Sequence, residues 1–141
     1  MLLPCEESVR FILPAVKRGI VRVLHEKFHL KQAEIANLLK ISQPSVSHFL
    51  KGIRGTALDV LSIDPEIKEA VETFSSDLVN KNLSDLEIYQ GICSICSLIR
   101  QKGYVPGVSP NYDITSSKTW DKVLLECEKV AQRTETKLVA D

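Results

Sequence analysis

The chain has 141 residues, of which 44% are hydrophobic and 26% are charged, a composition typical of a folded globular protein and not of a disordered one. This length has room for one domain, or for a small domain with a helical appendage. No apolar run approaches the roughly 20 residues needed to cross a bilayer, and the acidic start of the chain does not resemble a signal peptide, so we expect a cytoplasmic location.

Charge is distributed unevenly along the chain, although the formal net charge is zero. Residues 1–55 carry nine Lys or Arg and four acidic residues, a balance of +5, whereas residues 56–141 carry nine basic and fourteen acidic residues, a balance of −5. A basic block joined to an acidic block indicates that the first block faces a polyanion. The alternative is that the two blocks attract each other.

Helical patterns dominate the N-terminal part of the sequence. A first helix is expected to begin after Pro4 and to keep helical spacing to about His25, with a kink or two abutting helices at Pro14. Two short helices follow, at 31–39 and 43–51. After a turn at 52–55, residues 56–63 are either extended or a loop.

The remaining helices have recognisable starts. Asp64 is a good N-cap for a helix to about Leu78, and Ser84 opens a capping box for a helix that ends near Gly103. Residues 104–117 have the composition of a linker. A last helix, at about 118–132, carries one apolar face made of Trp120, Val123, Leu124, Cys127, Val130 and Ala131. The expected fold is all-α, with a helix-turn-helix domain at 1–55 and a helical dimerisation or sensor region at 56–141.

The two short helices carry the pattern that predicts function. Apolar residues give each helix one packing face, and the turn of about three residues between them allows a steep crossing, which is helix-turn-helix geometry. Ser42 can cap the second helix, and Pro44 suits its first turn because no backbone donor is needed there. The alternative is a packed helical hairpin with no binding role.

Short polar side chains occupy the other face of the second helix. A helix fits the major groove of DNA, where glutamine pairs with adenine and serine with either strand. Basic residues beyond its end suit phosphates, and the free N–H groups at the start of the first helix can also hold the DNA backbone. The expected DNA-binding residues are Lys31, Gln32, Ser42, Gln43, Ser45, Ser47, His48, Lys51 and Arg54.

The same stretch resembles a known family. Gln32, Ile35-Ala36, Ile41-Ser42, Val46-Ser47, Phe49-Leu50 and Gly52 resemble the phage-repressor-like (xenobiotic-response-element, XRE-type) helix-turn-helix domains. Residues 2–55 also resemble the N-terminal part of predicted archaeal transcriptional regulators of the thiamine-regulator family, with a looser resemblance over 64–103. This resemblance implies a DNA-binding regulator. The family usually has Gly at the position of Lys40, where a positive φ is often required. The thiamine-phosphate-binding domain of some relatives has no counterpart here, so that ligand is not implied.

Cysteines offer a second candidate site. Cys93 and Cys96 are three residues apart in a predicted helix, so they share a face, and such a pair can supply two ligands to zinc or to an iron–sulfur cluster. Cys5, at a helix start that favours its thiolate form, and Cys127 are the other candidate ligands. The family often shows Pro-Cys-Glu and a C-x-x-C pair, which this chain matches, and a further cysteine, which it lacks. The alternative is that Cys93, Cys96 and Cys127 are small buried apolar residues.

Catalytic patterns are missing from the sequence: it has no phosphate-binding glycine loop, nucleophile elbow or HExxH, so we do not expect an enzyme. One recognition helix reads only a few base pairs, and a homodimer is therefore expected on double-stranded DNA. Its interface candidates are the apolar face of 118–132 and the stripe Ile88, Ile92, Ile95 and Ile99, which fits an intramolecular core equally well. The alternative function is a helix-turn-helix protein-interaction module, antitoxin-like or part of a transcription complex.

Overall fold

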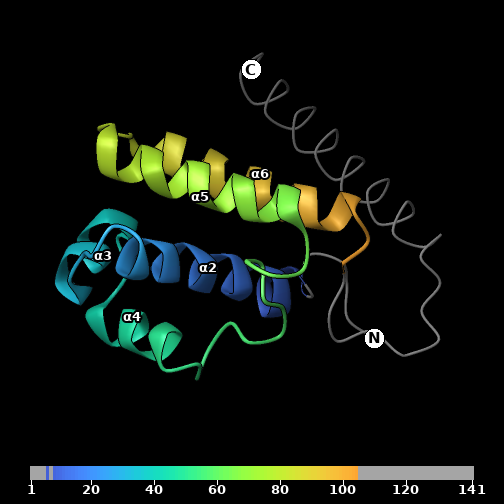
Figure 1. The fold of residues 1–141 in the computed structure, drawn as a ribbon, viewed down its shortest axis with the longest axis horizontal. Helices are drawn as coiled ribbons and strands as arrows, with labels where there is room; N and C mark the ends of the chain where they lie inside the picture. Colours follow the sequence, from blue (N-terminus) through green and yellow to red (C-terminus); the bar gives the residue numbers. More distant parts are fainter. Residues whose placement is uncertain (1–5, 7, 105–141) are drawn as a thin grey trace, which may run out of the picture.

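Five α-helices and one π-helical turn make up the described part of the chain, residues 6 and 8–104 of the computed structural model (Figure 1). These residues contain no strand, so the all-α prediction is confirmed for them. No helix among them is long and apolar enough to cross a membrane. The elements are η1 (Ser8–Ile12), α2 (Leu13–Glu26), α3 (Gln32–Leu39), α4 (Gln43–Leu50), α5 (Pro65–Asn80) and α6 (Asp85–Gln101).

Helix α2 is the centre of the fold. It lies between the α5–α6 pair and the α3–α4 pair and packs against all four helices (Figure 1). A helix covered on several sides needs apolar or small residues around most of its circumference, beyond the single stripe of a surface helix. Its buried residues meet that requirement: Ala15, Val16, Gly19, Ile20, Val21, Val23 and Leu24.

The start of α2 shows how the chain accommodates Pro14. Proline has no N–H for the bond to the preceding turn, and its ring crowds that turn. The helix therefore begins at Leu13 with Pro14 in its first turn, directly after the π-helical turn Ser8–Ile12. Two abutting helical segments, one of the predicted alternatives, are confirmed here.

Helices α5 and α6 form a hairpin whose two N-caps were predicted from sequence. Asp64 accepts hydrogen bonds from the N–H groups of Glu66, at 2.8 Å, and Ile67, at 3.4 Å. Ser84 and Glu87 form the reciprocal capping box, with both bonds at 3.2 Å. Each cap satisfies backbone donors that the helix itself leaves unpaired.

The isoleucine stripe of α6 faces the interior. Ile88, Ile95 and Ile99 are 6%, 3% and 0% exposed, and Ile92 packs partly buried against the same core. This stripe therefore belongs to the intramolecular core, and it is not available as a dimer interface. The other predicted interface, in 118–132, lies outside the described residues.

One core spans the position where the sequence predicted a domain boundary. Residues 56–63 form a loop with turns, and Val60 from this loop is buried against α2. The close approach is possible because Gly19 has no side chain on the facing side of α2. Residues from both sides of position 55 thus share one core, while the independence of 1–55 as a domain stays a prediction.

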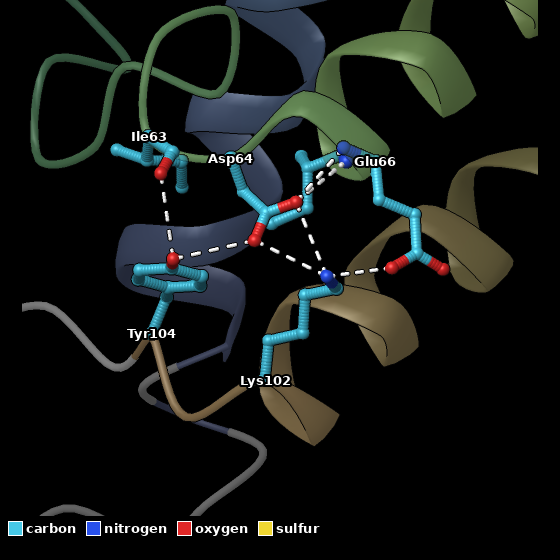
Figure 2. A network of polar contacts seen from close by, with 6 residues as sticks. Ile63, Asp64, Glu66, Lys102 and Tyr104 are labelled. Carbon is cyan, nitrogen blue, oxygen red and sulfur yellow. Dashed lines mark hydrogen bonds and ion pairs between the residues drawn. The ribbon is translucent and has the colours of Figure 1, made fainter.

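A polar network joins the two ends of the α5–α6 hairpin (Figure 2). The Lys102 ammonium group lies 3.1 Å from Asp64 and 2.6 Å from Glu66, and the Tyr104 hydroxyl lies 3.4 Å from both the Ile63 carbonyl and the Asp64 carboxylate. Partial burial opposes ionisation of Asp64, but hydrogen bonds from Lys102 and from two backbone N–H groups outweigh this effect and lower the pKa of Asp64. The hydrogen bond to Glu66, and next in size the hydrogen bond to Asp64, raise the pKa of Lys102.

Candidate nucleic-acid interface

The turn between α3 and α4 is set by a left-handed residue. Lys40 has φ 55° and ψ 42° directly after α3, and the N–H of Ile41 donates to the carbonyl of Ala36 at 3.1 Å. This bond spans six residues, as in a Schellman motif, and it reverses the chain at the helix end. The family resemblance implied a positive φ at position 40, and Lys40 has this conformation.

Helix α4 begins at once after this turn. Ser42 is in an extended conformation, and its hydroxyl accepts a hydrogen bond from the N–H of Ser45 at 3.2 Å. The two serine hydroxyls also share a hydrogen bond of 2.8 Å. The predicted N-cap at Ser42 is therefore confirmed. Because only residues 40–42 separate the helices, α3 and α4 pack against each other and both pack on α2.

The C-terminal end of α4 is fixed by its own turn and by α2. Gly52, at φ 72°, donates to the Phe49 carbonyl at 3.2 Å, and the N–H of Ile53 donates to the His48 carbonyl at 2.9 Å, a complete Schellman motif. The Phe49 carbonyl also accepts a bond of 3.3 Å from the Arg18 side chain on α2. Sequence reasoning did not identify this role of Arg18, because the contact joins residues 31 positions apart.

The packing face of α4 determines which side chains remain outside. Val46 and Phe49 are buried against the core. Gln43, Ser47 and Lys51 follow each other at intervals of four residues on the other side of the helix, and His48 lies beside them. The outer face therefore combines hydrogen-bonding groups with one cation.

None of the nine predicted DNA-binding residues is buried. Ser42 and Ser45 are engaged with each other, and Arg54 reaches back to the Ser45 hydroxyl at 3.5 Å. The exposed residues are Lys31, Ser42, Gln43, Lys51 and Arg54, and the half-buried ones are Gln32, Ser45, Ser47 and His48.

The basic residues of the N-terminal block include two groups that bear on the interface. Some pair with acidic residues of the second block: Arg22 with Asp59 at 3.3 Å, Lys27 with Glu72 at 3.4 Å, and Lys40 with Asp85. The attraction between the blocks, which was the alternative for the charge asymmetry, thus accounts for part of it.

The second group remains available at the ends of the helix pair. Within the described part of the chain, Lys31 before α3 and Lys51 after α4 form no ion pair. Among the described residues, no side chain caps the N-terminus of α3, so its first N–H groups are open to an anion.

Of the four cysteines predicted as metal ligands, the structure describes Cys93 and Cys96. Cys93 is exposed and Cys96 is buried, on one side of α6. Burial raises the pKa of the Cys96 thiol to about 11, although Arg100 lowers it in part, so in the absence of a metal this group is a neutral thiol at pH 7. The described residues contain no cluster of three or more His, Cys, Asp or Glu that could hold a metal ion. They do not fit a metal site by themselves, and Cys5 and Cys127 lie outside the described residues.

Comparisons with known proteins do not assign the chain to a family: no family model, curated protein or solved structure matches it.

Proposed function

We propose that the protein is a sequence-specific DNA-binding transcriptional regulator that places α4 in the major groove of double-stranded DNA. The observation that carries this proposal is the α3–turn–α4 unit. A three-residue turn, a capped second helix and an outer face of glutamine, serine, histidine and lysine occur together. A helix that only packs usually presents longer charged side chains to water.

The geometry suggests different roles for the predicted DNA-binding residues. Gln43, Ser47 and His48 lie on the outer face of α4 and are assigned to base edges. Lys31 and Lys51, at the outer ends of the helix pair, are assigned to phosphates. Ser42 and Ser45 hydrogen-bond to each other, so we assign them to holding the first turn of α4.

Binding to DNA tests the proposal directly. Fragments selected from genomic DNA by the purified full chain are labelled, and the affinity is measured by fluorescence anisotropy against a random duplex at several salt concentrations. Gln43→Ala and His48→Ala are expected to weaken binding to the selected fragment by about 5- to 100-fold and to leave binding to the random duplex nearly unchanged. Lys51→Ala is expected to weaken both and to reduce the salt dependence by about one released counterion.

Matched controls on the hairpin keep this test specific. Gln90→Ala on α6 and Lys81→Ala after α5 remove the same residue types from exposed positions away from α4, and neither is expected to change affinity. Equal losses on both duplexes for Gln43→Ala and His48→Ala would contradict the assignment to base edges. No selected fragment at all would contradict the function.

A homodimer remains part of the proposal, because two half-sites supply the specificity that one recognition helix lacks. Its interface is not assigned to the Ile88–Ile99 stripe, which is buried. Light scattering of the free and DNA-bound protein tests it: a complex with two chains per duplex is expected, and one chain per duplex would contradict it.

A protein partner is the second candidate function, favoured by one observation. Ile53, directly after α4, is 63% exposed, and an isolated apolar side chain gains little from phosphates. In a protein-interaction module, Ile53→Ser would abolish partner capture. In the DNA-binding protein, Ile53→Ser leaves affinity for the selected fragment unchanged within about twofold, since surface changes of this kind have small effects.

A further inference from the structure

Helix α6 keeps an apolar stripe on its surface in addition to the one in the core. Leu86 and Tyr89 are 63% and 60% exposed, and Cys93 is also exposed. Their spacing of three and four residues places them on one face of the helix. We call Leu86, Tyr89 and Cys93 the outer stripe of α6.

Positive charge borders the C-terminal end of the outer stripe. Arg100 follows Cys93 by seven residues, so it lies on the same face of α6. Arg100 also reaches η1, where it donates to the Ser8 hydroxyl at 3.5 Å. At the other end, the exposed carboxylates of Asp85 and Glu87 flank Leu86, but Asp85 pairs with Lys40 and Glu87 accepts the capping bond from Ser84. Among the described residues, the uncompensated charge beside the stripe is therefore that of Arg100, which suits a partner whose apolar face is bordered by acidic groups.

The sequence contains such a face in the predicted helix 118–132. Its apolar face includes Trp120, Leu124 and Cys127. On a helix of regular geometry, Asp121 and Glu128 border one side of this face and Glu126 the other. The basic residues lie on the opposite side: Lys118, Lys122, Lys129 and Arg133.

We propose that residues 118–132 dock as an amphipathic helix on the outer stripe of α6 in the same chain. The connection is long enough: the 13 residues 105–117 can span up to about 45 Å when extended. Helix α6, with 17 residues, is about 26 Å long. The segment can therefore return along the whole of α6.

A groove between α5 and α6, of about 710 Å³, is the competing surface on the same hairpin. It is lined by Phe74 and Leu98 but also by Glu66, Glu69 and Asp77. Glu66 pairs with Lys102 and Asp77 with Lys81, but Glu69 has no ion pair within the described residues. Glu69 would face the acids that border the apolar face of 118–132, and like charges at close range are unfavourable. Charge thus favours the outer stripe.

Fluorescence of the full-length protein tests the docking, because Trp120 is its only tryptophan. Trp120 is expected to emit at short wavelength, as a tryptophan shielded from water does. Tyr89→Lys on the outer stripe is expected to shift this emission to that of the urea-unfolded chain. The matched control Ser94→Lys, which is exposed and lines the α5–α6 groove, is expected to leave the emission unchanged, and circular dichroism verifies that both variants keep their helices.

The opposite results would overturn the proposal. Trp120 emission at the unfolded wavelength in the unmodified protein would show no docking, and a shift with Ser94→Lys alone would place the segment in the α5–α6 groove. Emission that moves to longer wavelength on 100-fold dilution would identify a second copy as the binding partner.

Cross-linking provides a measurement that requires no variant. A short bismaleimide is expected to join Cys93 to Cys127 within one chain, as identified by peptide mass. A link between two chains, or no Cys93–Cys127 link, would count against docking in the same chain.

Discussion

Lys40 adopts a backbone conformation that usually belongs to glycine. Its φ of 55° places the β-carbon close to the following carbonyl, which costs roughly 1–2 kcal/mol for an L-residue. The bond from Ile41 to Ala36 and the packing of Leu39 hold the turn in spite of this cost. The ion pair between Lys40 and Asp85 is exposed on both sides, so it offsets only part of the strain.

Substitutions of Lys40 separate the backbone strain from the contribution of the ion pair with Asp85. Lys40→Gly is expected to stabilise the protein by about 1 kcal/mol, since relief of the strained conformation exceeds the loss of an exposed ion pair. Lys40→Ala is the control, because it removes the ion pair and keeps the β-carbon, and it is expected to be neutral or slightly destabilising. Urea denaturation measures both, and equal stability of the two variants would contradict the role of φ.

Residue-level predictions succeeded where the signal is local. Ser42, Asp64 and Ser84 were identified as N-caps because a cap depends only on residue type and on the next three residues. The difference between Cys93 and Cys96 could not be predicted, since both lie on the same helix and the burial of Cys96 depends on how the other elements pack against α6.

Helix α4 is a short element of eight residues that depends on both of its ends. Isolated helices of this length are unstable in water, so the Ser42 cap, the Gly52 turn and the bond from Arg18 each contribute to holding it on α2.

Two substitutions at Ser42 distinguish stability from DNA binding. Ser42→Ala is expected to destabilise the protein by about 1 kcal/mol through loss of the cap. Ser42→Asp keeps a good cap, and its stability in urea is expected to be close to that of the unmodified protein. Its negative charge at the start of α4 would nevertheless repel phosphates, so affinity for DNA is expected to fall at least tenfold. Full DNA affinity in a stable Ser42→Asp protein would argue against an α4 N-terminus at the groove.

Because of the polar network around Asp64, the stability of the protein is expected to change with pH in the acidic range. Because the pKa of Asp64 is lowered in the fold, its contribution is present above its ordinary value, near 4, and is lost as the pH falls through the lowered pKa. Asp64→Asn keeps a capping side chain without the charge. Its thermal midpoint is expected to be lower than that of the unmodified protein at pH 7, and the difference is expected to shrink as the pH approaches 2.

Glu69→Gln is the control for this titration, because Glu69 is an exposed carboxylate of α5 that takes no part in the network. It is expected to follow the unmodified protein across the whole pH range. A constant difference between Asp64→Asn and the unmodified protein from pH 7 to pH 2 would show that the charge of Asp64 is not responsible.

The first and last residues of the helices could be predicted to within about two residues. Which helices pack against each other could not be predicted. Capping residues and the period of apolar residues give the limits of α3 to α6, as the capping box at Ser84 illustrates. Which helix covers the Ile88–Ile99 stripe depends on contacts distant in sequence, and periodicity gives no information on those.

At the scale of the whole molecule, the packing of α2 against α5 depends on Gly19. A methyl group at this position would overlap the Val60 side chain and contact Val71. In an exposed helix the change from glycine to alanine stabilises by up to about 1 kcal/mol. Here Gly19→Ala is expected to destabilise by about 1–3 kcal/mol, because overpacking in a rigid core exceeds the gain in helix propensity.

The sign of this change is the decisive result. Measured in urea, a stabilising Gly19→Ala would show that Val60 moves aside at little cost. Ala15→Gly is the comparison on the same helix: Ala15 is 1% exposed, so the substitution is expected to destabilise through lost burial and lower helix propensity.

The organisation of the whole chain was the least predictable level. The charge asymmetry suggested separate blocks, yet Val60 and the α5–α6 pair share a core with α2. Charged residues lie at the surface. The two blocks are joined mainly by buried apolar residues of α2, which pack against α3–α4 and against α5–α6. The limits of α3 and α4 and the Ser42 cap could be predicted because they depend on local sequence, but the bond from Arg18 that supports α4 could not.

The central position of α2 determines which parts of the protein can unfold locally while the rest stays folded. Helices at the periphery can separate from the core one at a time, whereas the amides of Val16 to Leu24 become accessible only after both layers have left. In heavy water these amides are expected to exchange last, with the free energy of complete unfolding, while those of α4 exchange earlier. The helix assigned to DNA would then be able to loosen and re-form many times on a scaffold that stays intact.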